Sequence, residues 1–222
     1  MKTYLSKFTL SVSLVVLLTG CAALKTNNSS SPILIEASID LENVVDDKVK
    51  ITISPSALVS DEIIFYIPQI VPGTYEYSNF GRFAEDLKAF DSKGNSLTVT
   101  AIDQNSWKIE GAKKLQRITY WVNDTFDGPD GSEIYPMGGT SFDTDKTHLL
   151  NLHSMIGYFE NLKESPYKLS VRSPKNLQAF TSLPSISNFG VTPGEDLFFL
   201  KFYQKSSNIN KGATIRIKYA TG

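Results

Sequence analysis

Short segments in which apolar and polar residues alternate recur along most of the chain, and this alternation limits the fold more than any other feature. In ILIEASIDL (33–41) the residues Ile35, Ala37 and Ile39 are each separated by one polar residue. The same spacing returns in KVKITI (48–53). Because successive side chains of a strand point to opposite faces, a period of two is typical of half-buried strands.

Alternating, β-branched or aromatic segments occur at 33–41, 48–53, 63–67, 97–101, 107–109, 118–122, 149–152, 167–171, 198–203 and 214–219. We therefore predict an all-β domain, an antiparallel β-sandwich-like arrangement of about ten strands with at most one or two short helices. Only 79–89 has helical spacing, and an extended conformation remains an alternative there. The Gly-, Asp- and Pro-rich segment 124–145 is predicted to be a long loop, of the kind that often carries function or an interface.

The first 20 residues have the pattern of a bacterial lipoprotein signal peptide. Two lysines precede an apolar run of about eleven residues, which is shorter than the ~20 that a membrane-spanning helix needs. The run ends in Leu-Thr-Gly-Cys (18–21), which resembles a lipobox, so we predict cleavage before Cys21 and its modification with palmitate-type acyl chains. A soluble secreted protein is the alternative. Cys21 is the only cysteine, so the chain forms no intrachain disulfide.

The predicted organisation is a signal peptide (1–20), a lipidated flexible tether (21–31) and a β domain (32–222). The net charge of −1 becomes −3 after loss of two lysines with the signal, which argues against nucleic acid as a partner. The expected partner is the membrane, reached through the lipid anchor. The protein is expected in the cell envelope. No acidic cluster follows Cys21, and resemblance to known sorting signals then implies the periplasmic face of the outer membrane, with the cell surface as the alternative.

We find no residues arranged for catalysis, cofactor binding or metal binding. The two histidines, His148 and His153, are spaced H-L-L-N-L-H and belong to no H-E-x-x-H or Cys-His pattern. Ser141, Asp143 and His148 form no recognisable triad, since no G-x-S-x-G accompanies them. The chain is expected to have no enzymatic activity and no cofactor of its own.

Aromatic residues offer two interpretations. They can line a groove for a peptide or glycan, or they can form core and cross-strand pairs. The segment 151–159 raises the same choice. Its apolar residues either form, together with the loop 124–145, an exposed surface for a partner, or they fold inward as core. The candidate interface residues are Met155, Ile156, Tyr158 and Phe159.

The stretch IPQIVPGTY (67–75) is predicted to be a structural corner and not an active site. Pro72 cannot donate to a strand ladder and Gly73 permits a turn with positive φ. The aromatic residues Tyr75, Tyr77 and Phe80 are expected to anchor this corner against the domain. Trp107 is expected to contribute to stability by burial.

Several segments, in this order, resemble one known family: IPQIVPGTY, FGRF, LKAFDSKGNSLTV, IDQNSWKI, ITYWVNDTFD, LLNLHSMIGYFE, PYKLSV and TSLP. Together they are similar to the N-terminal domain of the glycyl aminopeptidase family of zinc metallopeptidases (family M-sixty-one), in its Bacteroidota-type lipoprotein branch. The resemblance implies a β-rich, non-catalytic domain that precedes a thermolysin-like catalytic domain. Zinc is then expected only in that catalytic domain, which we expect this chain to lack.

The resemblance also implies where this chain differs from its family. A common tryptophan is Ile70 here, and a common Arg-Asp pair is Ser78-Asn79, whereas Arg82 is retained and is a candidate for the interface with the catalytic domain. The predicted function is an accessory domain of a zinc aminopeptidase-like lipoprotein that helps to shape a peptide cleft. The alternatives are a stand-alone envelope lipoprotein that binds a peptide, glycan or protein, and a gene fragment without function.

Overall fold

The structure is a computed structural model that describes residues 33–71, 74–126, 134–143, 147–163, 165–174, 177–181, 199–204 and 214–217. Residues 1–32 lie outside these ranges. The signal peptide, the modification of Cys21 and the tether therefore stay predictions.

The described residues form an all-β fold, as predicted, with fifteen strands, one short α-helix and three 3-10 helices. The strands of the first half are β1 (Ile35–Val45), β2 (Lys48–Pro55), β3 (Glu62–Tyr66), β4 (Ala84–Asp91), β5 (Ser96–Leu97), β6 (Val99–Asp103), β7 (Ser106–Glu110) and β8 (Leu115–Asn123). Those of the second half are β9 (Ser141–Asp143), β10 (Thr147–Asn151), β11 (Tyr158–Phe159), β12 (Tyr167–Arg172), β13 (Leu177–Thr181), β14 (Phe199–Gln204) and β15 (Thr214–Ile217). The helices are η1 (Phe80–Phe83), η2 (Ala112–Lys114), η3 (Pro136–Gly138) and α1 (Leu152–Met155). None of these helices has the length and apolar character needed to cross a membrane.

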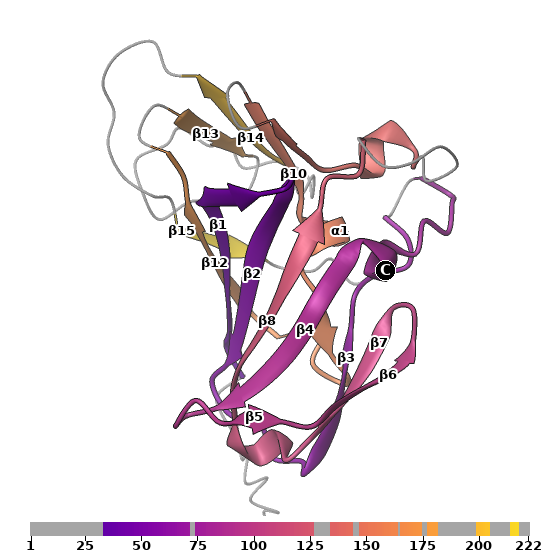
Figure 1. Cartoon of the computed structure of the whole chain (residues 1–222), viewed down its shortest axis with the longest axis vertical. Coiled ribbons are helices and arrows are strands. Elements are labelled where there is room, and N and C mark those ends of the chain that lie inside the picture. The colour runs from indigo at the N-terminus through magenta and orange to yellow at the C-terminus, as the bar shows by residue number, and fades with distance from the viewer. Residues whose placement is uncertain are drawn as a thin grey trace, which may run out of the picture. The chain divides into compact units, whose positions relative to one another are not determined.

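The strands form three sheets (Figure 1). The largest has the order β15-β12-β1-β2-β8-β4-β5, and the two four-stranded sheets have the orders β13-β14-β10-β9 and β11-β3-β7-β6. Pairing is antiparallel throughout the described strands except between β1 and β12, which run parallel from Ile35↔Tyr167 to Asp40↔Arg172. The predicted antiparallel arrangement is therefore correct for all pairs but this one.

The alternation seen in the sequence directs one face of the large sheet to the core. In β1 the buried residues recur with a period of two, and β2 and β8 continue this face through the registered pairs Ile39↔Ile51 and Ile51↔Tyr120. Each of these side chains is fully buried. Burial of apolar area on this scale, at ~25 cal/mol per Å², is the main stabilising contribution.

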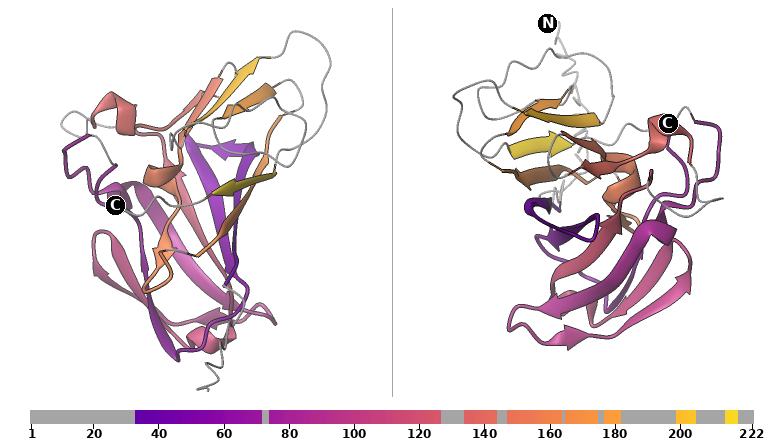
Figure 2. Two further views of the ribbon diagram at one scale, coloured as in Figure 1. Left: turned by 180° about the vertical axis from the view of Figure 1, so that it is seen from behind. Right: turned by 45° about the horizontal axis from the view of Figure 1, so that its top comes forward.

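The sheet β11-β3-β7-β6 covers this apolar face. Phe65 of β3 packs against Tyr120 of the large sheet, with ring centroids 5.9 Å apart, and against Phe159 of β11 at 5.3 Å. The contact between Phe65 and Tyr120 joins the two sheets face to face, which is the arrangement of a β-sandwich. Figure 2 shows the β6–β7 hairpin next to β4 at one end of this domain, and β13 and β14 towards the other.

The segment with helical spacing, 79–89, is mostly extended. It begins as the single 3-10 turn η1 and then forms strand β4. Phe80 and Phe83 are buried from the turn, and Ala89 is buried from the strand. The extended alternative is correct from Ala84 onward, because pairing with β8 satisfies the backbone there.

The segment that follows β3 turns the chain as predicted, although not all of the expected residues anchor it. Asn79 N–H donates to the Gln69 carbonyl at 2.9 Å, and Phe80 N–H donates to the Pro68 carbonyl at 3.3 Å. A side chain at Gly81 would overlap Asn105, so this close approach requires glycine.

Several corner residues need correction or lie outside the description. Pro72 and Gly73 are not among the described residues. The anchoring role predicted for Tyr75 and Tyr77 is wrong, because their side chains are 94% and 72% exposed. Phe80, in contrast, is buried as predicted. Trp107 is half-buried and packs against the core from β7, where it pairs with Phe65.

Candidate functional site

A network of hydrogen bonds around Tyr120 fixes the chain that leads into β11. The Tyr120 hydroxyl donates to the Met155 carbonyl at 2.7 Å and accepts from Gly157 N–H at 3.2 Å. The Tyr167 hydroxyl donates to the Gly157 carbonyl at 3.1 Å. A Cβ on Gly157 would overlap the Phe65 ring, so the backbone lies directly against the core. This packing determines where Tyr158, the next residue, points.

The predicted interface over residues 151–159 is wrong for most of its residues. Met155, Ile156 and Phe159 are each 0% exposed and belong to the core. The hydrogen bond from the Tyr120 hydroxyl to the Met155 carbonyl holds this segment against β8. Tyr158 alone is half-buried and reaches the surface. Arg82 is exposed on η1, with its guanidinium 4.6 Å from the Phe83 ring centroid.

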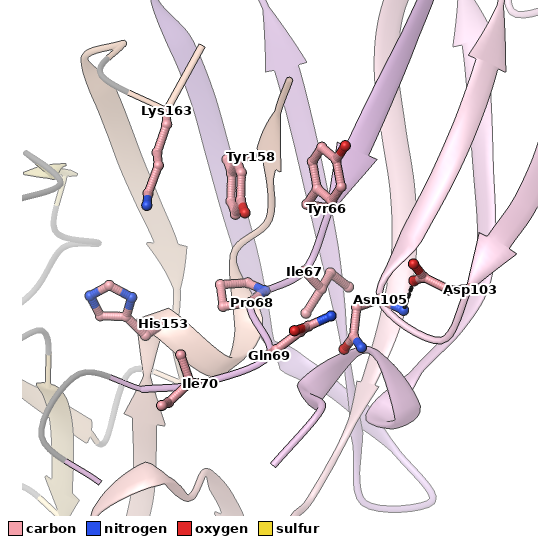
Figure 3. Close-up of a pocket in the computed structure, with 10 residues that line it drawn as sticks. All are labelled: Tyr66, Ile67, Pro68, Gln69, Ile70, Asp103, Asn105, His153, Tyr158 and Lys163. Carbon is pink, nitrogen blue, oxygen red and sulfur yellow. Dashed lines mark hydrogen bonds between the residues drawn. The ribbon is translucent and has the colours of Figure 1, made fainter. Parts of the chain in front are cut away.

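Tyr158 lines a hollow of about 380 Å³ in the surface (Figure 3). This volume lies within the ~300–1,000 Å³ range of small-molecule sites. The hollow lies at the end of β3, between the corner segment 67–70, the turn before β7 and the turn after β11. Its lining residues are Tyr66, Ile67, Pro68, Gln69, Ile70, Asp103, Asn105, His153, Tyr158 and Lys163.

Two stacked tyrosines form the aromatic wall of the hollow. Tyr66 and Tyr158 are directly opposite each other in the β3–β11 register, and their rings lie 5.4 Å apart at 23°. Burial and the neighbouring Tyr66 raise the pKa of the Tyr158 hydroxyl above its usual value. Both hydroxyls are therefore neutral donors and acceptors near neutral pH.

One side of the hollow is electropositive. The Lys163 ammonium lies 6.0 Å from the Tyr158 ring centroid, a distance typical of a weak cation–π contact. His153 lies on α1, where its backbone N–H donates to the Asn151 side chain at 3.2 Å. Burial, and then the positive charge of Lys163, lower the pKa of the His153 imidazole to about 4, so this group is neutral near pH 7.

The opposite side carries a carboxylate and two amides (Figure 3). Asp103 accepts from Asn105 N–H at 2.7 Å, and this bond together with the Ser106 hydroxyl lowers the pKa of the carboxyl group. The Asn105 side chain is tied to the corner, since it accepts from Gly81 N–H at 3.0 Å and donates to Asn79 at 3.1 Å. Gln69 is exposed beside them. The two sides of the hollow therefore differ in charge.

A second surface feature is a group of exposed apolar side chains, which we call the apolar rim. It consists of Ile70 (37% exposed), Tyr75 (94%), Tyr77 (72%), Phe126 (45%) and Tyr135 (45%). The segments that carry them are in contact, because a Cβ at Gly138 would lie 3.7 Å from Val71 and one at Gly139 would overlap Phe126. The described parts of the predicted loop 124–145 thus contribute two residues to an exposed apolar surface.

The described residues do not fit a zinc site. They contain no group of three or more His, Cys, Asp or Glu side chains that could hold a metal ion. His148 is buried in β10, whereas His153 lines the hollow.

Sequence reasoning identified Tyr158 of this hollow but missed most of the other lining residues. Tyr66 and Tyr158 are far apart in the chain, and only the β3–β11 register brings them together. Two local signals were present. The corner 67–75, interpreted as structural, supplies Ile67, Pro68, Gln69 and Ile70. The second is the turn at Gln104-Asn105, because turn residues after an exposed strand often carry polar groups at a sheet edge.

Comparison with solved structures shows which known fold the domain resembles. The fold is similar to that of an aminopeptidase N family protein from Idiomarina loihiensis, with a TM-score of 0.63 and 19% identity. The similarity covers 77% of this chain and 29% of that chain, so this chain spans less than a third of the solved protein. An M1 zinc metallopeptidase from Deinococcus radiodurans matches with a TM-score of 0.33 and 7% identity, over 83% of this chain and 41% of that chain. A search of the curated proteins found no match.

The family follows from the sequence match. Residues 36–205 match the model of the Peptidase M61 N-terminal domain, which is most of the chain. The chain therefore belongs to the Peptidase M61 N-terminal domain family, as its sequence segments predicted.

Proposed function

We propose that this chain is the non-catalytic accessory domain of a zinc aminopeptidase-like lipoprotein and that it forms one wall of a peptide cleft. The observation that carries this proposal is the match of residues 36–205 to an N-terminal domain of a peptidase family. Zinc and the catalytic groups would be held by another part of the peptidase, on the same or a separate polypeptide.

The apolar rim is the surface best suited to contact the catalytic region of the peptidase. Its residues include two tyrosines that are more than two-thirds exposed, and contiguous exposed apolar side chains typically mark an interaction site. Aromatic residues are also enriched at the energetic centres of interfaces.

An antibody against the β domain tests the proposal directly. Native protein isolated with it should contain zinc, a polypeptide region with H-E-x-x-H, and activity that releases N-terminal glycine from peptides. Native material that contains neither zinc nor peptidase activity would reject the accessory role.

The apolar rim is tested in the same assay. If the catalytic region is a separate polypeptide, a Tyr75→Ser, Tyr77→Ser double variant should lose it. If the two regions form one chain, the same variant should reduce peptide hydrolysis. Val59→Ser is the matched control, because Val59 is 84% exposed and outside the rim. Equal loss in rim and control variants would count against the rim.

We also propose that Cys21 anchors the protein to the periplasmic face of the outer membrane. Two or more acyl chains give lasting attachment, since each buried methylene contributes ~0.8 kcal/mol. Mass spectrometry of the membrane fraction should detect acyl chains on Cys21, and Cys21→Ala protein should appear in the soluble fraction. Removal of the protein by protease treatment of intact cells would instead place it on the cell surface.

A further inference from the structure

We propose that the hollow beside Tyr158 binds the free carboxylate end of a short peptide, with Lys163 as its ionic partner. This inference rests on the proposed function in one respect, namely that peptides are the relevant ligands. The location and the charge of the bound group are argued from the hollow itself.

The position of Lys163 is the first part of the argument. Two consecutive turns follow β11, closed by Leu162 N–H to the Phe159 carbonyl and Ser165 N–H to the Leu162 carbonyl, both at 3.0 Å. Asn161, within the first turn, adopts a positive φ of 60°. These turns fix the backbone of Lys163 beside the hollow, and its side chain extends towards His153 (Figure 3).

The charge of Lys163 has no carboxylate partner within the described residues. Lys48, Lys108 and Lys168, by comparison, each form an ion pair at 2.7–3.1 Å. Glu160 precedes Lys163 by three residues, but no salt bridge joins the two side chains. The ammonium is therefore available to an anionic group that enters the hollow.

His153 adds to the preference for an anion. Its imidazole lies on the same side of the hollow as Lys163 (Figure 3) and is kept neutral by burial and by the lysine. A carboxylate between the two groups would offset the positive charge of Lys163. A single lysine with no arginine is a weaker match for a phosphate dianion, which arginine clusters typically bind.

The rest of the hollow fits the chain that precedes such a carboxylate. Tyr158, Pro68 and Ile70 offer an apolar surface to a terminal side chain. On the far side, the Asp103 carboxylate and the Gln69 amide provide acceptors and donors for peptide groups or for a free amine. A short peptide with an apolar last residue therefore matches both the charge and the polarity of the lining.

The test compares binding of the tripeptide Gly-Gly-Leu as the free acid and as its C-terminal amide, by calorimetry on the purified full chain. We expect the amide to bind at least about tenfold more weakly, because it lacks the charge-assisted contact. The Lys163→Met variant should bind the acid as weakly as the wild type binds the amide. Lys93→Met, at a separate hollow, is the matched control and should bind like the wild type.

A spectroscopic measurement locates the bound carboxylate independently. The chain has two histidines, so the imidazole signal of His153 can be assigned with a His153→Gln variant. The acid peptide should shift this signal in NMR spectra, and the amide should not. Equal binding of acid and amide, unchanged binding by Lys163→Met, or no binding of either peptide would overturn the proposal.

These outcomes are separate from those of the accessory-domain experiment. Acid-selective binding by a native protein that has neither zinc nor peptidase activity would reject the proposed function and keep the carboxylate site. Native zinc and peptidase activity without acid-selective binding would reject only the site.

Discussion

The two faces of the β3–β11 strand pair have different roles. Phe65 and Phe159 point into the core, are 0% exposed, and pack edge to face at 5.3 Å. Tyr66 and Tyr158, one residue away in each strand, point to the hollow and stack at 5.4 Å. The comparison shows that strand alternation separates residues that hold the fold from residues that are available to a ligand, with no change of backbone.

The largest effect should come from the core face. Phe65→Ala removes the ring that joins the two sheets and should lower the free energy of unfolding by roughly 3–5 kcal/mol, because a cavity remains. Tyr66→Ala, on the other face of the same strand, should cost less than about 1 kcal/mol. Urea denaturation of both variants measures the difference, and equal losses would contradict the division between the two faces.

Next in size is the pH dependence produced by His153. Its pKa of about 4 in the folded state lies below the ordinary 6.5, so only the unfolded state takes up a proton between these values. The free energy of unfolding is therefore highest above pH 6.5. It falls as the pH drops towards 4, by about 3 kcal/mol in total. Denaturation of wild type and His153→Gln across this range should show a flatter profile for the variant. Parallel profiles would mean that the imidazole titrates normally.

Loss of the Tyr120 hydroxyl, which holds the chain between α1 and β11, should have a moderate effect on stability. Tyr120→Phe leaves the Met155 carbonyl and Gly157 N–H without this partner in a buried setting, which should cost about 1–3 kcal/mol. Tyr135→Phe is the control, because that ring is 45% exposed. A Tyr120→Phe protein as stable as this control would show that the segment before Tyr158 is held by packing alone.

The smallest effect on stability should be at the hollow itself. Tyr158→Phe keeps the ring stack with Tyr66 and should change the free energy of unfolding by less than about 0.5 kcal/mol. Thermal unfolding measures this directly. A clear loss of stability would indicate that the Tyr158 hydroxyl belongs to the structural network, which would remove it from the lining available to a ligand.

The sequence predicted the core face well, because the signal there is local. Ile35, Ala37 and Ile39 alternate within one segment, and β1 buries all three. The family resemblance, carried by ordered segments, was likewise confirmed by the match over residues 36–205.

The hollow could not be predicted in the same way, because it depends on register between distant strands. Nothing near Tyr66 indicates that Tyr158 will lie opposite it. Met155, Ile156 and Phe159 were open to two interpretations for a related reason. Their burial follows from the Tyr120 hydroxyl, which is more than thirty residues away in the chain.

The parallel pairing of β1 with β12 has a consequence for the order of events during synthesis. Glu36 and Lys168, joined by an ion pair across this pairing, are 132 residues apart. At ~5–20 residues per second, the edge of β1 stays open for on the order of ten seconds while the intervening chain is made. Nascent chains should therefore remain protease-sensitive until β12 has left the ribosome, and an open strand edge in that interval is a site where a chaperone can act.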